Sequence, residues 1–192
     1  MPIKKSASKA TGKASRTRNE RTHVTHEFPA LYDRESRVLL LGSIPSPKSR
    51  EMAFYYGHPQ NRFWKVLAGV LDCPVPQNIP EKREMLLAHR IALWDSIASC
   101  RIEGSSDASI TDVVPNDLSP IFETAQIRQV FCNGKKSHEM YRRCIEPQLG
   151  RPALCLPSTS PANAAWSLQR LTEAWREALL PVLAEAKSPP QS

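Results

Sequence analysis

Four short apolar runs along the chain predict the strands of one sheet. They lie at residues 37–42 (RVLLLG), 91–94 (IALW), 130–132 (VFC) and 153–156 (ALCL). Each run is almost continuously apolar and does not alternate with polar residues, which is typical of parallel strands buried on both faces. We therefore expect a buried sheet with a core on each side.

Helical patterns fall between these runs. Apolar residues recur at intervals of three and four over 62–71, and further helical patterns cover 80–89 and 135–145. The last pattern is the longest, with Ser160 as the expected N-cap, Pro161 as the first helical residue and apolar positions continuing to Val182. Alternating strands and helices predict an α/β fold, a three-layer α/β/α sandwich with a mostly parallel four-stranded sheet.

The formal net charge of +7 is concentrated at the amino terminus. Residues 1–22 contain seven Lys/Arg and one acidic residue, whereas the rest of the chain is nearly neutral. Such a segment can bind a polyanion such as nucleic acid, or it can be a solvated leader without a partner. We interpret residues 1–25 as a basic flexible tail, 26–186 as the folded domain and 187–192 as a flexible carboxyl terminus.

Composition narrows the class of protein. Hydrophobic residues make up 41% and charged residues 23%, as in one ordinary globular domain. The sequence shows neither a bilayer-spanning run nor a secretory signal, so we expect a cytoplasmic protein without membrane contact. The five cysteines are odd in number and lack C-x-x-C spacing, which argues against a disulfide framework or a metal centre. Cys132 and Cys155 lie in apolar runs and are expected in the core.

Candidate chemistry gathers where the predicted strands end, because ligands of open parallel sheets bind at the carboxyl ends of the strands. The first run is followed by GSIP at 42–45 and by the aromatic-rich stretch YYGHPQNRFW at 55–64. The other runs are followed by Asp95, by Asn133 and by PSTSPANA at 157–164. Aromatic rings can stack on a flat ligand and amides can bond to its edge. The alternative is a Pro-rich surface loop whose aromatic residues complete the core.

These motifs carry a resemblance to a known family. GSIP at 42–45, YYGHPQNRFW at 55–64 and LPSTSPANA at 156–164 resemble the two signature motifs of the uracil-DNA glycosylase superfamily, and the complete pattern is most similar to its deoxyinosine (hypoxanthine) branch. The resemblance covers roughly residues 35–180 and implies an N-glycosylase. No lysine is evidently placed as a Schiff-base nucleophile, so we expect a monofunctional enzyme, and we expect that it needs no metal or cofactor. Its expected partner is double-stranded DNA containing a deaminated base, and we expect a monomer.

Two positions depart from the usual motifs of the superfamily. Ile44 stands where an Asp or Asn usually positions the attacking water, and Leu156 stands where a His or Asn usually contacts the base. Neither side chain can do this, which disfavours ordinary uracil excision. The resemblance to the deoxyinosine branch then makes Asn61 the leading catalytic candidate, with a plain helix N-cap as the alternative.

The resemblance also implies which residues surround the base. Tyr56 is the expected stacking partner of the extruded base, and Asn133 and Asp95 are the expected readers of its edge. The first motif contributes Gly42, Ser43, Ile44 and Pro45. The alternatives are core packing for Tyr56, a turn residue for Asn133 and a cap for Asp95.

The second motif is expected to contact the DNA backbone. Its loop contains Ser158, Thr159, Ser160 and Pro161. Hydroxyl groups and free backbone amides at a helix start bind phosphate well. A simple capping turn is the alternative interpretation.

The sequence therefore predicts a DNA-deoxyinosine glycosylase that hydrolyses the N-glycosidic bond of hypoxanthine. Two alternatives stay open at this point. One is a uracil or mismatch-specific glycosylase of the same fold. The other, of a different class, is a non-catalytic DNA-binding module.

The basic tail leads to a first prediction. If residues 1–22 bind DNA phosphates, their deletion weakens DNA binding and flattens its salt dependence, while the rate of the bound complex is unchanged. Binding titrations across a salt series measure the slope. An unchanged slope would identify the segment as a solvated leader.

Overall fold

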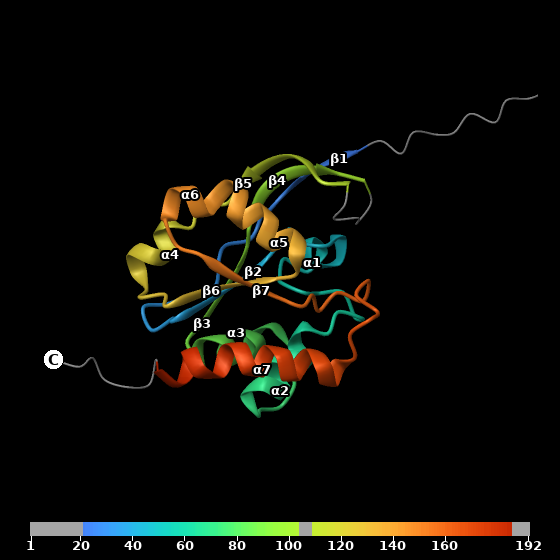
Figure 1. Cartoon of the computed structure of the whole chain (residues 1–192). Helices are drawn as coiled ribbons and strands as arrows, with labels where there is room; N and C mark the ends of the chain where they lie inside the picture. Colours follow the sequence, from blue (N-terminus) through green and yellow to red (C-terminus); the bar gives the residue numbers. More distant parts are fainter. Residues whose placement is uncertain (1–20, 104–108, 186–192) are drawn as a thin grey trace, which may run out of the picture.

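The computed structural model describes residues 21–103 and 109–185. Its centre is a four-stranded parallel sheet in the order β3-β2-β6-β7 (Figure 1). The strands are β2 (Val38–Gly42), β3 (Ile91–Asp95), β6 (Gln129–Asn133) and β7 (Ala153–Leu156). All four runs predicted from the apolar pattern are therefore strands, and the predicted parallel sheet is confirmed.

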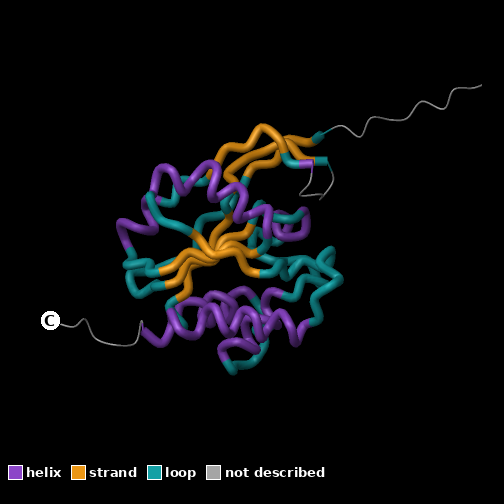
Figure 2. Tube along the Cα trace, in the orientation of Figure 1, coloured by secondary structure: helices purple, strands orange, loops and turns teal. Residues whose placement is uncertain are grey.

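Helices cover both faces of this sheet (Figures 1 and 2). One layer contains α2 (Phe63–Leu71), α3 (Ile79–Ala88) and α7 (Leu168–Glu185). The other contains α4 (Ser119–Thr124), α5 (Lys135–Met140), the π-helical turn η2 (Tyr141–Ile145) and α6 (Glu146–Leu149). A short α1 (Pro47–Glu51) follows β2. The three layers of the predicted sandwich are thus present.

The central strand β2 supplies both cores. Because successive side chains of a strand point to opposite faces, Val38 and Leu40 join the core beneath α2 and α7. Leu39 and Leu41 join the core beneath α4 and η2. Every residue of β2 is buried, which explains the uninterrupted apolar run in the sequence.

The edge strand β7 departs from this pattern. Leu154 and Cys155 are exposed, so the expectation that Cys155 lies in the core is wrong, whereas Cys132 on β6 is fully buried. An edge strand has a neighbour on one side only, and its apolar run does not guarantee burial. None of the five cysteines, all of which lie in the described ranges, forms a disulfide bond. No helix in the described ranges has the length and apolar character needed to cross a membrane.

A second sheet was not predicted from the sequence. It is antiparallel, in the order β1-β4-β5, with β1 (Thr22–Thr25), β4 (Ile97–Ile102) and β5 (Thr111–Pro115). Strand β1 lies inside the segment expected to be a tail, so the boundary between residues 25 and 26 is wrong. Val24 is buried against β4 while its strand neighbours are exposed, and this burial orders the segment. Residues 1–20 and 186–192, which hold most of both predicted tails, lie outside the described part. A deletion that tests the tail should therefore end at Glu20.

The start of the last helix also differs from the prediction. Helix α7 begins at Leu168, and Ser167 accepts a hydrogen bond from the Arg170 N–H as its cap. Ser160 and Pro161 lie in the preceding loop. The Arg62 guanidinium donates hydrogen bonds to backbone carbonyls of this loop. Those carbonyls are therefore not available for the hydrogen bonds of a helix.

Candidate active site

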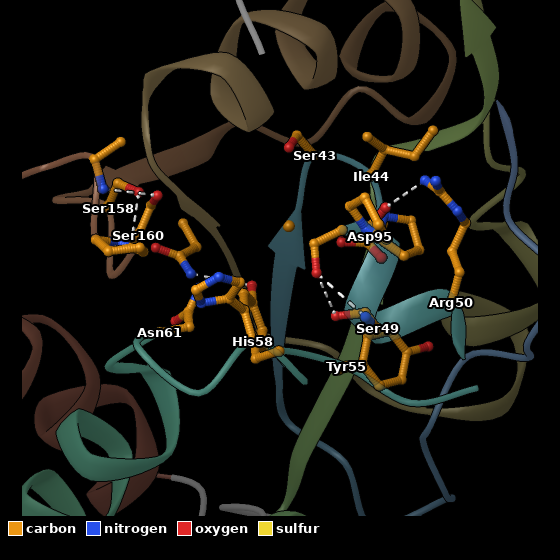
Figure 3. A pocket seen from close by; sticks show the side chains of 18 of the residues that line it. Ser43, Ile44, Ser49, Arg50, Tyr55, His58, Asn61, Asp95, Ser158 and Ser160 are labelled. Carbon is orange, nitrogen blue, oxygen red and sulfur yellow. Dashed lines mark hydrogen bonds between the residues drawn. The ribbon is translucent and has the colours of Figure 1, made fainter. Parts of the chain in front are cut away.

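A cavity of about 410 Å³ opens at the carboxyl ends of β2, β3 and β6. Every site residue predicted from the sequence lines it except Thr159. Further lining residues include Ser46, Ser49 and Arg50, and also Tyr55 and His58 of the aromatic-rich stretch at 55–64. Figure 3 shows Asn61, His58 and the second-motif serines on one side and Asp95, Ile44 and Arg50 on the other.

Strand register brings the first motif and Asp95 together. Gly42 and Asp95 are direct partners where β2 pairs with β3. A Cβ atom on Gly42 would overlap the Oδ1 atom of Asp95, so the carboxylate can lie against the strand only because residue 42 is glycine. Asp95 is 4% exposed, and its Oδ2 lies 2.8 Å from Nε2 of His26. No motif or apolar pattern in the sequence singles out His26.

A buried hydrogen-bond network joins the two motifs through Thr159. The Thr159 N–H donates to Oδ1 of Asn133 at 3.0 Å, and Nδ2 of Asn133 donates to the Thr159 hydroxyl at 2.9 Å. That hydroxyl donates in turn to Oδ1 of Asn61 at 2.9 Å. Thr159 is 0% exposed, so its side chain cannot contact DNA as predicted. It positions Asn61 and Asn133 instead.

The network fixes the orientation of the Asn61 amide. Its Oδ1 accepts from the Phe63 N–H at 3.0 Å as well as from Thr159. A backbone N–H can only donate, so the atom facing it must be the oxygen. The Nδ2 group has no hydrogen bond to another described residue, and Asn61 lines the cavity. Asn61 therefore both accepts the first N–H of α2 and presents an N–H donor to the cavity.

Asn133 is more fully engaged than predicted. Besides its two bonds to Thr159, its Nδ2 donates to the Tyr56 hydroxyl at 3.1 Å. Both amide hydrogens are thus bonded within the protein. A ligand contact through either hydrogen would break one of these bonds, so we assign Asn133 to holding Tyr56 and Thr159 in place.

Tyr56 adopts an unusual backbone conformation, with φ of 50°. Positive φ is costly for a bulky residue and persists only where the surroundings impose it. Phe63 stacks on one face of the ring, with centroids 3.9 Å apart and planes at 15°. Phe63 and Asn133 together hold the half-buried ring in the cavity wall, where it can meet a flat ligand.

Arg62 holds the second-motif loop against the start of α2. Its guanidinium donates to the backbone carbonyls of Ser160 and Asn163 at 2.7 and 3.0 Å, and also to the carbonyl of Trp166. Its Nε donates to the Thr159 carbonyl at 3.3 Å. The loop therefore keeps one conformation although it is not helical.

Ser158, Ser160 and Pro161, which we call the rim residues, line the cavity. Their contact with the DNA backbone stays a prediction. The two serine hydroxyls accept from the N–H groups of Ser160 and Ala162, respectively. Pro161 is exposed. Gly134, at the end of β6, has φ of 97° and packs so closely on Ser158 that a Cβ would come within 2.9 Å of the serine Cβ. The loop is thus seated on β6 at a glycine.

The two apolar replacements in the motifs have different surroundings. Ile44 lines the cavity and packs partly against the core beneath the second sheet. Leu156 is 4% exposed and belongs to the core beneath α2 and α7. Pro45 is buried, and its carbonyl accepts from the Arg50 guanidinium at 3.0 Å. Arg50 thereby adds a positive charge to a cavity wall that has lost the usual polar residue.

Tyr55 and His58 have structural partners. Burial, followed by the nearby Asp95 charge, raises the pKa of the Tyr55 phenol far above its ordinary value. The phenol therefore stays protonated and donates to the Pro29 carbonyl at 2.8 Å. His58 is exposed and accepts from the Gln60 N–H through Nδ1 at 3.2 Å.

The Thr159 network yields a stability prediction. Thr159→Val keeps the shape of the side chain but removes the hydroxyl, and it leaves Asn133 Nδ2 and Asn61 Oδ1 each without one buried partner. We expect the free energy of unfolding to fall by ~1–3 kcal/mol, the usual cost of unsatisfied buried polar groups. Denaturant titration measures the change.

Thr172→Val is the matched control. Thr172 donates its hydroxyl to the Leu168 carbonyl within α7, away from the cavity. This variant should lose less than the Thr159 variant. Equal stability of Thr159→Val and the parent protein would show that the network does not hold the loop.

Comparison with known proteins agrees with this geometry. Residues 29–182 match the uracil DNA glycosylase superfamily. The chain is 36% identical over 151 residues to a protein named hypoxanthine DNA glycosylase from Methanosarcina acetivorans, covering 76% of this chain and 92% of that protein. It is 34% identical over 153 residues to a protein of the same name from Methanosarcina barkeri, covering 79% and 95%.

A solved structure supports the same assignment. The solution NMR structure of a candidate uracil DNA glycosylase from Methanosarcina acetivorans superposes with a TM-score of 0.69 at 34% identity. The match covers 82% of this chain and 96% of the solved one. The extent of these matches, together with the two motifs meeting at one cavity, shows that the chain belongs to the uracil DNA glycosylase superfamily.

Proposed function

We propose that this protein is a monofunctional DNA glycosylase that removes hypoxanthine from deoxyinosine in double-stranded DNA. The orientation of Asn61 is the observation that carries the proposal. Its carbonyl oxygen is bound by Phe63 and Thr159, and its N–H donors are left for the cavity. The relatives named hypoxanthine DNA glycosylase support the choice of base.

The reaction follows from the groups around the cavity. The bond between C1′ of the sugar and the base nitrogen breaks, and its electron pair leaves with the base. The Nδ2–H of Asn61 donates to the base as negative charge develops, which is where a fixed donor lowers the barrier most. Water then adds to the oxocarbenium-like sugar at C1′ and loses a proton to solvent. Such a sugar accepts water without a strong base, so Ile44 at the usual carboxylate position does not block the reaction.

The nucleotide must leave the duplex to reach the cavity, and a weakened base pair lowers that cost. The Tyr56 ring, held by Phe63 and Asn133, supplies a surface on which the extruded base can stack. The rim residues Ser158, Ser160 and Pro161 are placed to contact the DNA backbone. In this mechanism each motif has a separate task.

Single-turnover cleavage of duplexes bearing inosine, uracil or xanthine tests the proposal. Fastest cleavage of the inosine duplex supports it. Fastest cleavage of uracil would favour the uracil or mismatch branch instead. Binding without cleavage of any duplex would favour a non-catalytic DNA-binding module.

Asn61→Ala tests the catalytic role. We expect the single-turnover rate on inosine DNA to fall by ~10²–10³-fold, the usual loss for one preorganised donor. Duplex binding should fall much less, because phosphate contacts dominate affinity. Asn78→Ala is the matched control, since Asn78 caps α3 through its side chain and is remote from the cavity. A parental rate in folded Asn61→Ala would overturn the mechanism.

Asn61→Asp separates two possible roles of this side chain. One carboxylate oxygen can still accept from Phe63 and Thr159, but the other replaces the donor with a negative acceptor. If Asn61 donates to the leaving base, the Asp variant should be as slow as the Ala variant. Retained or increased activity would show that the residue orients water instead.

Tyr56 variants test the stacking surface. Tyr56→Ala should weaken binding to DNA with a damaged base by ~1–3 kcal/mol, the usual value of one base–aromatic stack. Tyr56→Phe keeps the ring and loses only the acceptor for Asn133, so its effect should be small. Fluorescence binding titrations compare the two. A large loss in the Phe variant would mean that the hydroxyl, and not the ring, is the important group.

A further inference from the structure

We infer that His26 is a positioning residue that holds Asp95 as a hydrogen-bond acceptor for bases carrying an imino N–H. The inference rests on the proposed function and deepens it, because it names the chemical feature of the base that the site selects. The observation is a buried histidine–carboxylate pair in the cavity wall that the glycosylase mechanism above does not use.

The histidine is rigidly held. His26 directly follows β1, and its backbone N–H donates to the Ala98 carbonyl at 2.7 Å. Its side chain is 1% exposed. The ring centroid lies 4.3 Å from that of Phe28, 6.1 Å from Tyr55 and 6.2 Å from Trp94. Three aromatic rings thus fix the direction in which the imidazole points.

The imidazole makes a single polar contact in the described part of the chain. Its Nε2 lies 2.8 Å from Oδ2 of Asp95, whereas its Nδ1 is buried without a hydrogen-bond partner. A buried N–H without a partner is costly. The favoured arrangement therefore has the proton on Nε2, donated to Asp95, and a bare Nδ1. Because the Nε2–H group of His26 needs an acceptor, this hydrogen bond favours the form of Asp95 in which Oδ2 is an unprotonated acceptor.

The other carboxylate oxygen is then placed for a ligand. Oδ1 of Asp95 lies over the backbone of Gly42, and the position that a Gly42 Cβ would take is also 3.1 Å from the Tyr56 hydroxyl. Asp95 lines the cavity, and its backbone carbonyl is held by Nδ2 of Asn116 at 2.9 Å. The carboxylate is therefore fixed at both its backbone and its Oδ2, next to the ring expected to stack on the base.

A fixed carboxylate distinguishes deaminated bases from their parents. Hypoxanthine has an N–H at N1 where adenine has a lone pair, and uracil has an N–H at N3 where cytosine has a lone pair. A carboxylate oxygen accepts from the N–H and repels the lone pair. Donation from His26 to Oδ2 also draws charge from the carboxylate, which reduces its repulsion of a base that leaves as an anion.

The test measures discrimination between bases, because a ratio of two dissociation constants is unaffected by a partly inactive preparation. Duplexes carry 2′-fluoroarabino analogues, which resist cleavage, of inosine, adenosine, uridine or cytidine. We expect His26→Ala to reduce the preference for inosine over adenosine by about 10- to 100-fold, the value of one hydrogen bond to a charged group. The preference for uridine over cytidine should fall in parallel, and Asp95→Ala should show the same losses.

Conservative and control variants separate positioning from packing. His26→Gln can still donate to Asp95 from its terminal amide and should restore part of the preference. His23→Ala is the matched control, since His23 lies on β1, three residues before His26, and is exposed; its ratios should equal those of the parent. Unchanged ratios in folded His26→Ala, or in Asp95→Ala should the first variant not fold, would overturn the inference.

The same experiment distinguishes this inference from the proposed function. Cleavage of inosine DNA by the parent protein tests the function alone. If the parent does not cleave inosine DNA, the proposed function is overturned. If His26→Ala nevertheless has a lower preference for uridine over cytidine than the parent, the inference is supported. Cleavage of inosine DNA by the parent, with the parental preference kept in both His26→Ala and Asp95→Ala, would support the function and overturn the inference.

Discussion

The contact between the second-motif loop and the start of α2 is the constraint on which the active site depends. Segments about a hundred residues apart in sequence meet there, through Arg62 on one side and the buried Thr159 on the other. The guanidinium satisfies loop carbonyls that would otherwise belong to a helix, and the Thr159 hydroxyl bonds to Asn61. Without this contact the loop would have no reason to keep its position, because few of its residues are buried.

Catalytic geometry follows from that contact. An asparagine in a solvated loop would turn its amide freely, whereas Asn61 has its oxygen bound at two points and offers only N–H to the cavity. The strained backbone of Tyr56 is compensated in the same region by Phe63 and Asn133. Contacts within the folded protein thus hold the side chains of Asn61 and Tyr56 in place before DNA binds, as preorganised electrostatic stabilisation requires.

The small antiparallel sheet supports the first motif. Strand β4 continues from the end of β3 after one residue, and the Ser96 and Ile97 N–H groups donate to the carbonyls of Gly42 and Ser43. Strand β1 pairs with β4 and delivers His26 behind Asp95. The sheet therefore braces the first motif from outside the sandwich, and His26, just after β1, supports the lining residue Asp95 from behind.

The sequence by itself determined the layers of the fold and the location of the site. Continuous apolar runs marked the four parallel strands, because burial on both faces leaves no polar positions, and the motif residues marked the cavity, because parallel strands end on one side of a sheet. Only the tertiary structure decided what each residue does there. Thr159 and Ser160 look alike in the sequence, yet one is fully buried and the other lies at the rim. No local sequence pattern indicates that His26 contacts Asp95. No local pattern indicates which carbonyl groups Arg62 binds. Burial and hydrogen-bond partners in these cases come from segments far away along the chain, and local patterns carry no information about them.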